Sequence, residues 1–290
     1  MPVLFPPPSY ISFSQLMTYV RCPEHYLFRY MLGIKRPPTK AMIRGSAIHD
    51  TLASDYIQKK NRGFAMKERE AQELYENLLA QHMEKYKKGL GESSFLLTKE
   101  FLQREENTSV SELLDAGTRG IRAYKREVER KTEPVLVEAS FGIPMSKDME
   151  IVGRIDLADT SSIVHETKTA KKKPALQDVA SDPQIAFYIL GYEALTGQRP
   201  KSMVKDFIIF QKLEASIVRY PVVKSSIDQK TLFRYIKNVL QAIKQNVWYC
   251  LHPADSWICS KEWCGYWKLH KELRRLGLPK FVEKYGTAKT

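Results

Sequence analysis

The sequence contains no apolar run long enough to cross a membrane. Its longest apolar stretches, such as Phe207–Phe210, fall far short of the roughly 20 residues that a membrane-spanning helix needs. The first residues, Met-Pro-Val-Leu-Phe-Pro-Pro-Pro, lack the charged start and apolar centre of a secretory signal. We therefore expect a cytoplasmic protein that does not bind a membrane.

Cysteine is scarce, and one nucleotide-binding pattern is missing. The chain has four cysteines in 290 residues, and no Gly-x-x-x-x-Gly-Lys-[Ser/Thr] segment. Four cysteines in an intracellular chain are more typical of reduced thiols or metal ligands than of disulfides. Without that phosphate-binding loop the chain carries no helicase signature, so any motor has to be a separate protein.

Positive charge, by contrast, is in excess. The sequence has 46 Lys and Arg against 33 Asp and Glu, which gives a formal net charge of +13. Such an excess attracts polyanions and supplies contacts to phosphate groups. It does not separate DNA from RNA, or a nuclease from a protein that only binds. The length fits one large domain with insertions, or one domain with a smaller lobe.

The first 131 residues carry helical patterns. Ser12–Gln15 has the spacing of a capping box, which predicts a helix that starts there. A second helix is expected from about Gly45 to Gln58. Residues 64–131 are rich in Glu, Lys, Leu and Ala and contain another capping box at Ser109–Glu112. We expect this segment to form a helical insertion.

The following residues predict a sheet covered by helices. Runs rich in β-branched residues with turn-prone ends predict five strands, and helical patterns lie between and after them. The fold class predicted is therefore α/β, with a central mixed β-sheet flanked by helices. The strands are expected at Pro134–Pro144, Glu150–Asp159, Ser162–Thr169, Lys205–Leu213 and Ser216–Val223, and the helices at Pro183–Leu195, Ser226–Asn246 and Tyr266–Leu276.

The most specific signal is an acidic hairpin. If the chain turns at Thr160–Ser162, Asp156 lies opposite Glu166, and Lys168 shares their face of the sheet. Converging carboxylates suit Mg²⁺ or Mn²⁺. The lysine could orient or deprotonate a water molecule, or neutralise charge on a phosphate, and the pattern leaves this open. The alternative is a surface hairpin with a cross-strand ion pair.

Five short motifs then occur in an order that resembles a known family. The chain is similar to the PD-(D/E)XK nuclease superfamily, RecB-type branch, and resembles CRISPR-associated and AddB-like iron–sulfur exonucleases. The resemblance implies a restriction-endonuclease-like core and hydrolysis of phosphodiester bonds. The motifs are Tyr19–Tyr26, Gly45–His49, Gly153–Asp156, Glu166–Lys168 and Gln184–Tyr188.

The resemblance also implies roles for individual residues. The metal ligands would be side chains on a helix and on two strands, together with one backbone carbonyl. A glutamine and a tyrosine four residues apart share a helix face and would position DNA. The catalytic residues expected are Asp156, Glu166 and Lys168; the metal ligands are His49, Asp156, Glu166 and the carbonyl of Thr167; the DNA-positioning residues are Gln184 and Tyr188.

The cysteines imply a second metal centre. Relatives with a cluster have one cysteine before the histidine motif and three near the end of the chain, which here would be Cys22 and then Cys250, Cys259 and Cys264. They imply a [4Fe–4S] cluster that ties the first helix to the tail. The tail departs from the usual Cys-x-x-Cys-x5-Cys spacing, so either Cys250 or His270 is the fourth ligand. Structural Zn²⁺ and free buried thiols are the alternatives.

We therefore expect four segments and one main function. The segments are N-terminal helices (1–63), a helical insertion (64–131), the nuclease core (132–248) and a cysteine-containing tail (249–290). The function implied is an Mg²⁺- or Mn²⁺-dependent deoxyribonuclease, an exonuclease acting on single-stranded DNA or free ends in repair, recombination, phage DNA processing or CRISPR adaptation. The alternative is a non-catalytic or partner-dependent DNA-binding subunit, with a helicase or an integrase-type protein as partner.

Overall fold

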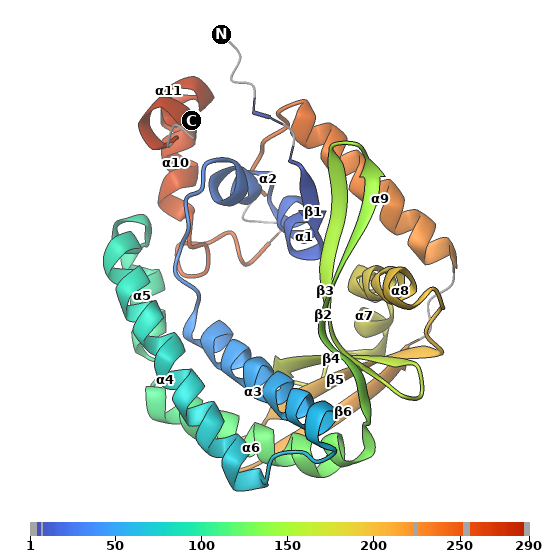
Figure 1. Ribbon diagram of the computed structural model, residues 1–290. Helices are drawn as coiled ribbons and strands as arrows, with labels where there is room; N and C mark the ends of the chain where they lie inside the picture. The colour runs from blue at the N-terminus through green and yellow to red at the C-terminus, as the bar shows by residue number, and fades with distance from the viewer. Residues whose placement is uncertain (1–4, 7, 223–225, 252–255, 287–290) are drawn as a thin grey trace. The chain divides into compact units, whose positions relative to one another are not determined.

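The computed structural model describes residues 5–6, 8–222, 226–251 and 256–286 (Figure 1). The chain forms two compact units. The first unit comprises Met1–Thr39, Lys85–Thr108 and Phe233–Thr290, and the second comprises Lys40–Glu84 and Ser109–Leu232. These boundaries differ from the four segments expected from the sequence, and that division stays a prediction. No helix among the described residues has both the length and the apolar character needed to span a membrane.

The second unit contains a mixed sheet. Its strands are β2 (Pro134–Ser146), β3 (Met149–Asp159), β4 (Ile163–Ala170), β5 (Ser202–Phe210) and β6 (Ala215–Val222). Among these five strands, neighbours pair in chain order; the β4–β5 pair is parallel, and the β2–β3, β3–β4 and β5–β6 pairs are antiparallel. Six of the nine β5 residues are buried, because β5 has a hydrogen-bonded neighbour on each side and helices cover the sheet.

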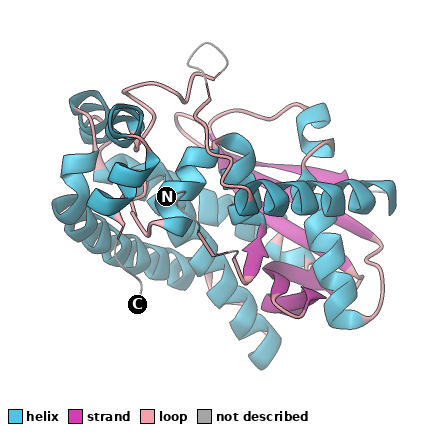
Figure 2. Cartoon of the chain, turned by 90° about the horizontal axis from the view of Figure 1, so that it is seen from above, coloured by secondary structure: helices cyan, strands magenta, loops and turns pink. Residues whose placement is uncertain are grey.

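Helices cover both faces of this sheet (Figure 1). One side carries α3 (Lys40–Arg62) and α6 (Val110–Glu127), and the other carries α7 (Leu176–Ala180) and α8 (Pro183–Thr196). Figure 2 shows the strands in magenta among cyan helices in a second view. The parallel crossover from β4 to β5 runs through α7 and α8, as parallel neighbours require. The predicted α/β fold with a mixed central sheet is confirmed.

Local chemistry explains where α8 begins and ends. The side chain of Asp182 accepts a hydrogen bond from the backbone N–H of Gln184 (2.9 Å). Pro183 occupies the first turn, where a backbone N–H would have no partner within the helix, so its missing N–H costs nothing. Gly197 ends the helix with φ 70°, a left-handed conformation that glycine adopts without strain. Helix α8 therefore starts at a defined place, which matters because it carries Gln184 and Tyr188.

The first unit is mainly helical. A capping box opens its first helix as predicted: Ser12 Oγ accepts the N–H of Gln15 at 3.2 Å, and Gln15 Oε1 accepts the N–H of Ser12 at 2.7 Å. Its elements are β1 (Tyr10–Ser12), α1 (Phe13–Arg21), α2 (Pro23–Tyr26) with the π-helical turn Leu27–Met31, α5 (Lys99–Glu106), α10 (Trp267–Leu276) and α11 (Leu278–Tyr285). Helices α4 (Glu68–Ser93) and α9 (Ser226–Lys244) each contribute residues to both units.

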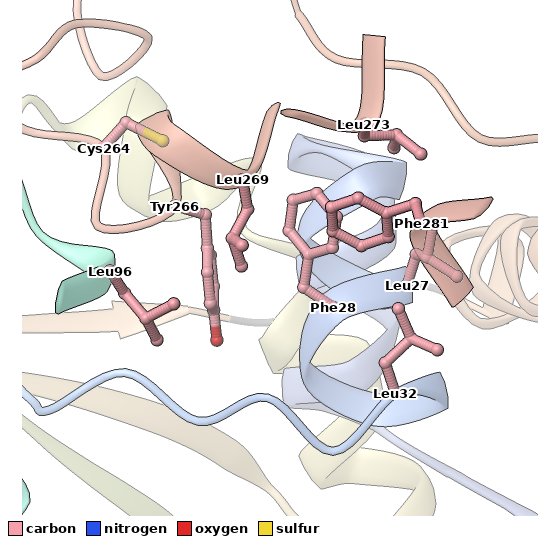
Figure 3. Close-up of a cluster of buried hydrophobic side chains, with 9 residues drawn as sticks. All are labelled: Leu27, Phe28, Leu32, Leu96, Cys264, Tyr266, Leu269, Leu273 and Phe281. Carbon is pink, nitrogen blue, oxygen red and sulfur yellow. The ribbon is translucent and has the colours of Figure 1, made fainter. Parts of the chain in front are cut away.

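A buried apolar cluster joins the segments of the first unit (Figure 3). The rings of Phe28 and Phe281 lie 5.4 Å apart between centroids, and Tyr266 packs against Phe28 at 5.5 Å. Cys264 belongs to the same cluster and is 3% exposed. This core brings the residues that follow α1 against those that open α10, although they are far apart in the sequence.

Some element boundaries differ from those predicted. The strand expected at Lys205–Leu213 is β5 and ends at Phe210, because Gln211 donates a backbone hydrogen bond to the carbonyl of Glu214 and closes a turn. Helix α6 ends at Glu127, and a 3₁₀ turn continues to Lys131. Helices α5 and α11 were not expected. The predicted last residue of the final strand, Val223, lies outside the described residues.

Candidate active site

The β3–β4 hairpin has the register assumed from the sequence. Leu157 pairs with His165 and Ala158 with Val164, so the hairpin centres on Ser161. The ladder stops there, one step before Asp156 and Glu166. The structure therefore places these two carboxylates near each other at the point where the strands separate, and hydrogen-bonded pairing no longer occupies the space between them.

Helix α3 brings a histidine to Asp156. His49 Nε2 lies 3.2 Å from Asp156 Oδ2 and 3.4 Å from Glu138 Oε1. Potential ligand atoms of these three residues all lie within 4.8 Å of one another. Hydrogen bonds to Asp156 and then Asp50 raise the pKa of His49 to about 10, although burial opposes them. The arrangement thus concentrates negative charge around one imidazole, which is what a cation site requires.

Glu138 is the residue of this group that the sequence motifs did not reveal. It lies on β2, between two residues that pair with β3, at Val137↔Leu157 and Ala139↔Ile155. That register places it opposite Asp156. The sequence did contain a signal for this residue. Glu138 is an acidic residue inside a β-branched run, and that run precedes the strand that carries the Gly-Arg-Ile-Asp motif.

The backbone at Glu138 is unusual. Its φ is 51°, in the left-handed region that residues other than glycine rarely adopt. Such a conformation costs on the order of 1–3 kcal/mol and is concentrated at functional sites. Arg154 Nε lies 2.6 Å from Glu138 Oε2, which leaves the other oxygen directed at His49. The backbone conformation and the ion pair together hold the other carboxylate oxygen toward His49.

Glu166 lies between two lysines. Its side chain has no exposed surface, and its carboxylate contacts Lys168 Nζ on one oxygen and Lys205 Nζ at 3.4 Å on the other. The parallel β4–β5 register pairs Glu166 with Lys205 directly. Lys205 is 2% exposed and also contacts Asp182. Burial raises the pKa of Glu166, while both lysines oppose that rise.

Lys168 carries its positive charge. Burial lowers its pKa, but the Glu166 carboxylate more than compensates, so the pKa of Lys168 lies above its ordinary value. Its side chain is 44% exposed, whereas Glu166 beneath it is not exposed. The ammonium group therefore faces a surface depression lined by residues of α3 and of β4, among them His49 and Thr167.

Two residues of helix α8 lie next to the carboxylate of Asp156. Tyr188 donates a hydrogen bond from its hydroxyl to Asp156 Oδ1 at 3.1 Å. Gln184 interacts in turn with Tyr188, one helical turn later. Thr167 donates its hydroxyl to Tyr124 at 3.3 Å and lines the depression. Of the residues predicted for this site, His49, Asp156, Tyr188 and Gln184 form one connected set, and Glu166 with Lys168 forms a neighbouring pair.

Gly153 allows this packing. A Cβ atom on Gly153 would lie 2.4 Å from a carbon of Phe141 and 2.7 Å from a carbon of Phe187. Both distances are well below van der Waals contact. The glycine of the Gly-Arg-Ile-Asp motif therefore allows the close approach of α8 to β3.

The donor set fits a divalent cation. An imidazole and two carboxylates that converge with ligand atoms within 4.8 Å offer nitrogen and hard oxygen ligands. Oxygen-rich sites of this kind suit Mg²⁺ or Mn²⁺. The carboxylate oxygens of Glu166 contact Lys168 and Lys205, and its role as a ligand stays a prediction.

The cysteines gather in the first unit. Cys22, Cys259 and Cys264 are buried and Cys250 is half-buried, and all four are free thiols. A small cavity is lined by Cys250, Cys259, Cys264 and His270. Cys250 donates a hydrogen bond that lowers the pKa of Cys22 to about 6. Thiolate and imidazole donors in one place suit zinc or an iron–sulfur cluster. Ligand atoms come within 4.8 Å of one another in two groups, Cys22 with Cys250 and His270, and His25 with Cys264 and His270, and the choice between the two predicted ligand sets stays a prediction.

Comparisons with known proteins agree with this geometry. The chain matches the family model described as the PD-(D/E)XK nuclease superfamily over residues 10–269. No curated protein matches it. The crystal structure of a protein provisionally assigned as an exonuclease, from Eubacterium rectale, is similar in fold over 82% of each chain, with 12% identity and a TM-score of 0.50. The crystal structure of SSO0001 covers 49% of this chain and 65% of that one, at 14% identity; its TM-score of 0.31 carries no argument. Because the family model spans most of its length, this chain belongs to the PD-(D/E)XK nuclease superfamily.

Proposed function

We propose that this protein hydrolyses phosphodiester bonds of DNA with Mg²⁺ or Mn²⁺. The observation that carries the proposal is the convergence of His49 with Asp156 at 3.2 Å and with Glu138 at 3.4 Å, beside the Glu166–Lys168 pair. The membership of the nuclease superfamily supports the reaction class. The resemblance to the RecB-type branch supports DNA as the substrate.

The residues divide into two groups by their chemistry. His49, Glu138 and Asp156 would hold the ion, with the carbonyl of Thr167 as a further ligand from the family resemblance. A bound divalent ion polarises the phosphate and lowers the pKa of a bound water. Tyr188 fixes the orientation of Asp156 by donating to the oxygen that does not face His49. That hydrogen bond leaves Asp156 Oδ2 for the cation.

Lys168 acts as a charged group in this proposal. A lysine that stays protonated beside a buried carboxylate cannot accept a proton from water. It can donate hydrogen bonds to a phosphate oxygen and stabilise the charge that develops there. Glu166 would then position Lys168 and set its charge, in addition to any contact with the ion. We therefore propose electrostatic stabilisation, and not general-base catalysis, as the role of this residue.

The finer substrate assignment rests on charge and family resemblance. A net charge of +13 supports binding to a polyanion. We propose an exonuclease that acts on free ends or single strands, in repair, recombination, phage DNA processing or CRISPR adaptation. Gln184 and Tyr188 would position the strand beside the ion. In the first unit, the cysteines and His270 would bind a [4Fe–4S] cluster or Zn²⁺.

The test is a cleavage assay with matched variants. End-labelled single- and double-stranded DNA, and the same DNA closed into a circle, are incubated with Mn²⁺, Mg²⁺ or EDTA. Asp156→Ala and Lys168→Ala should abolish cleavage, whereas the exposed Asp148→Ala and Lys172→Ala should not. Circles should resist if free ends are needed.

Each outcome of this assay is informative. Cleavage that needs metal and disappears in both folded active-site variants supports the proposal. Folded, metal-loaded protein that binds DNA without cutting it would instead indicate a binding subunit or a partner-dependent nuclease. Cleavage that survives both substitutions would place the reaction centre elsewhere.

A further inference from the structure

His270 and Glu24 form a buried pair in the first unit. His270 lies on α10 and is 3% exposed; Glu24 lies on α2 and is 7% exposed. His270 Nδ1 lies 2.5 Å from Glu24 Oε2, across a sequence separation of 246 residues. A buried carboxylate that is hydrogen-bonded to a histidine ring fixes the orientation of that ring.

The pair also determines which ring nitrogen is free. An ionised carboxylate only accepts hydrogen bonds, so Nδ1 of His270 carries a proton and donates it to Glu24. In a neutral imidazole the other nitrogen, Nε2, then presents a lone pair. Nε2 of His270 is buried, and the ring interacts with the side chain of Cys264, which is itself a candidate ligand.

The surroundings of His270 are thiols. Potential ligand atoms of Cys22, Cys250 and His270 lie within 4.8 Å of one another, and so do those of His25, Cys264 and His270. His270 is the member common to both groups. Figure 3 shows the side chain of Cys264 at the edge of the apolar cluster that includes Tyr266 and Leu269. The ring therefore lies between cysteines from both ends of the chain.

We propose that His270 binds the metal centre of the first unit through Nε2, together with cysteine thiolates, and that Glu24 is the positioning residue that presents it. A metal-bound histidine commonly donates its other N–H to a carboxylate, which fixes the tautomer and makes the ring a better ligand. The hydrogen bond from Nδ1 to Glu24 supplies that contact. The proposal rests on the metal centre proposed above and deepens it by naming the ligating nitrogen and the carboxylate that positions it.

His25 offers a second imidazole, but its environment differs. Its ring stacks on that of His270 with centroids 5.3 Å apart, and its Nε2 lies 3.4 Å from Cys264 Sγ. Among the described residues no carboxylate is paired with it. An N–H from His25 to the Cys264 sulfur would stabilise a thiolate ligand without making His25 a ligand itself.

The direct test is X-ray absorption spectroscopy on the full-length protein. Anaerobically purified protein is analysed for zinc, iron and sulfide, and the spectrum is recorded at the edge of the metal found. We expect sulfur scatterers plus one nitrogen scatterer with the outer-shell pattern of an imidazole ring. A first shell of sulfur alone, or full-length folded protein that binds neither zinc nor iron, would overturn the proposal.

Substitutions test the role of Glu24 separately. Glu24→Gln should lower metal affinity about 10- to 100-fold, as loss of a carboxylate behind a histidine ligand does. Glu262→Gln removes a carboxylate that is exposed in the same unit and should leave the affinity unchanged. His270→Cys should retain the metal but lose the imidazole scattering. Equal affinities for Glu24→Gln and Glu262→Gln would contradict the positioning role.

These measurements do not depend on DNA cleavage. Sulfur scatterers and sulfide content report the cysteine-containing site of the first unit, because the ligand group His49, Glu138 and Asp156 of the second unit has no cysteine. The cleavage assay reports the residues of the second unit. A protein that cuts DNA but has an all-sulfur metal shell would refute this inference and leave the proposed nuclease intact. A protein with the imidazole ligand that cuts no DNA would do the reverse.

Discussion

Replacing Lys205 by methionine should destabilise the protein through the buried Glu166. The side chain of Lys205 is 2% exposed and that of Glu166 is not exposed, and their charged atoms lie 3.4 Å apart. At an effective dielectric constant of about 20, this separation corresponds to about 5 kcal/mol of attraction. Methionine keeps the length of the side chain and removes the charge. Glu166 would then keep Lys168 as its cationic partner.

The net loss should be smaller than that attraction. Breaking a buried pair by removing one partner costs about 3–5 kcal/mol. Glu166 retains Lys168, and Asp182, the other partner of Lys205, is 31% exposed and can be hydrated. We therefore expect the lower end, a loss of about 3 kcal/mol in the free energy of unfolding at pH 7. Lys212→Met, at an exposed position, should change it by less than about 0.5 kcal/mol.

Lowering the pH should reduce the stability that is lost in the Lys205→Met variant. Burial already raises the pKa of Glu166, and removal of Lys205 should raise it further. A carboxyl group with a raised pKa in the folded state binds a proton there at a pH where the unfolded chain has released it. Lowering the pH from 7 to 5 therefore stabilises the folded variant relative to wild type. The difference in the free energy of unfolding between the wild-type protein and the variant should become smaller over this pH range.

Urea unfolding followed by circular dichroism is the appropriate assay. All four tryptophans, at 248, 257, 263 and 267, belong to the first unit, so their fluorescence does not report the second unit directly. Coincidence of the two signals would test whether both units unfold together. The double variant Glu166→Gln/Lys205→Met should recover part of the stability. A loss below 1 kcal/mol at pH 7, or one that does not change with pH, would refute this reasoning.

Three further changes follow from the site and its supports. Glu138→Gln should weaken Mn²⁺ binding about 10- to 100-fold in calorimetry, and equal binding by Glu138→Gln and the exposed control Glu150→Gln would count against Glu138 as a ligand. Asp55→Asn should cost about 3–5 kcal/mol in thermal or urea unfolding, because it leaves Lys125 buried without its closest carboxylate; a loss under 1 kcal/mol would contradict this. Gly153→Ala should cost about 1–3 kcal/mol, since the added methyl group would overlap two phenylalanine rings, and wild-type stability would show that the rings move freely.

The parts of the fold set by local chemistry could be predicted. The capping box at Ser12 and the register centred on Ser161 both occur as expected, because each depends on residues close in sequence. The strands were placed within a few residues, since β-branched runs identify buried strands whatever their partners. Helix α5 was missed because its eight residues are mostly charged and resemble the exposed segments around it.

Contacts between distant residues could not be predicted in the same way. The Glu24–His270 pair spans 246 positions, and neither residue has a local pattern that reveals the other. Lys205 could have been noticed, because a charged residue inside an apolar strand needs a buried partner. Its pairing with Glu166 depends on the register of the parallel strands β4 and β5, and no tight turn joins these strands to fix that register. Glu138 required the register of a hairpin whose turn was not assigned.

The left-handed backbone at Glu138 sets two selective pressures against each other. Glycine adopts φ 51° without the steric cost that glutamate meets. Glu138→Gly should therefore raise the free energy of unfolding by about 1 kcal/mol. A directed-evolution experiment that selected only for survival of heating would therefore be expected to discard the glutamate. One that selected for DNA degradation would be expected to keep it, because the carboxylate beside His49 would be lost with the strain.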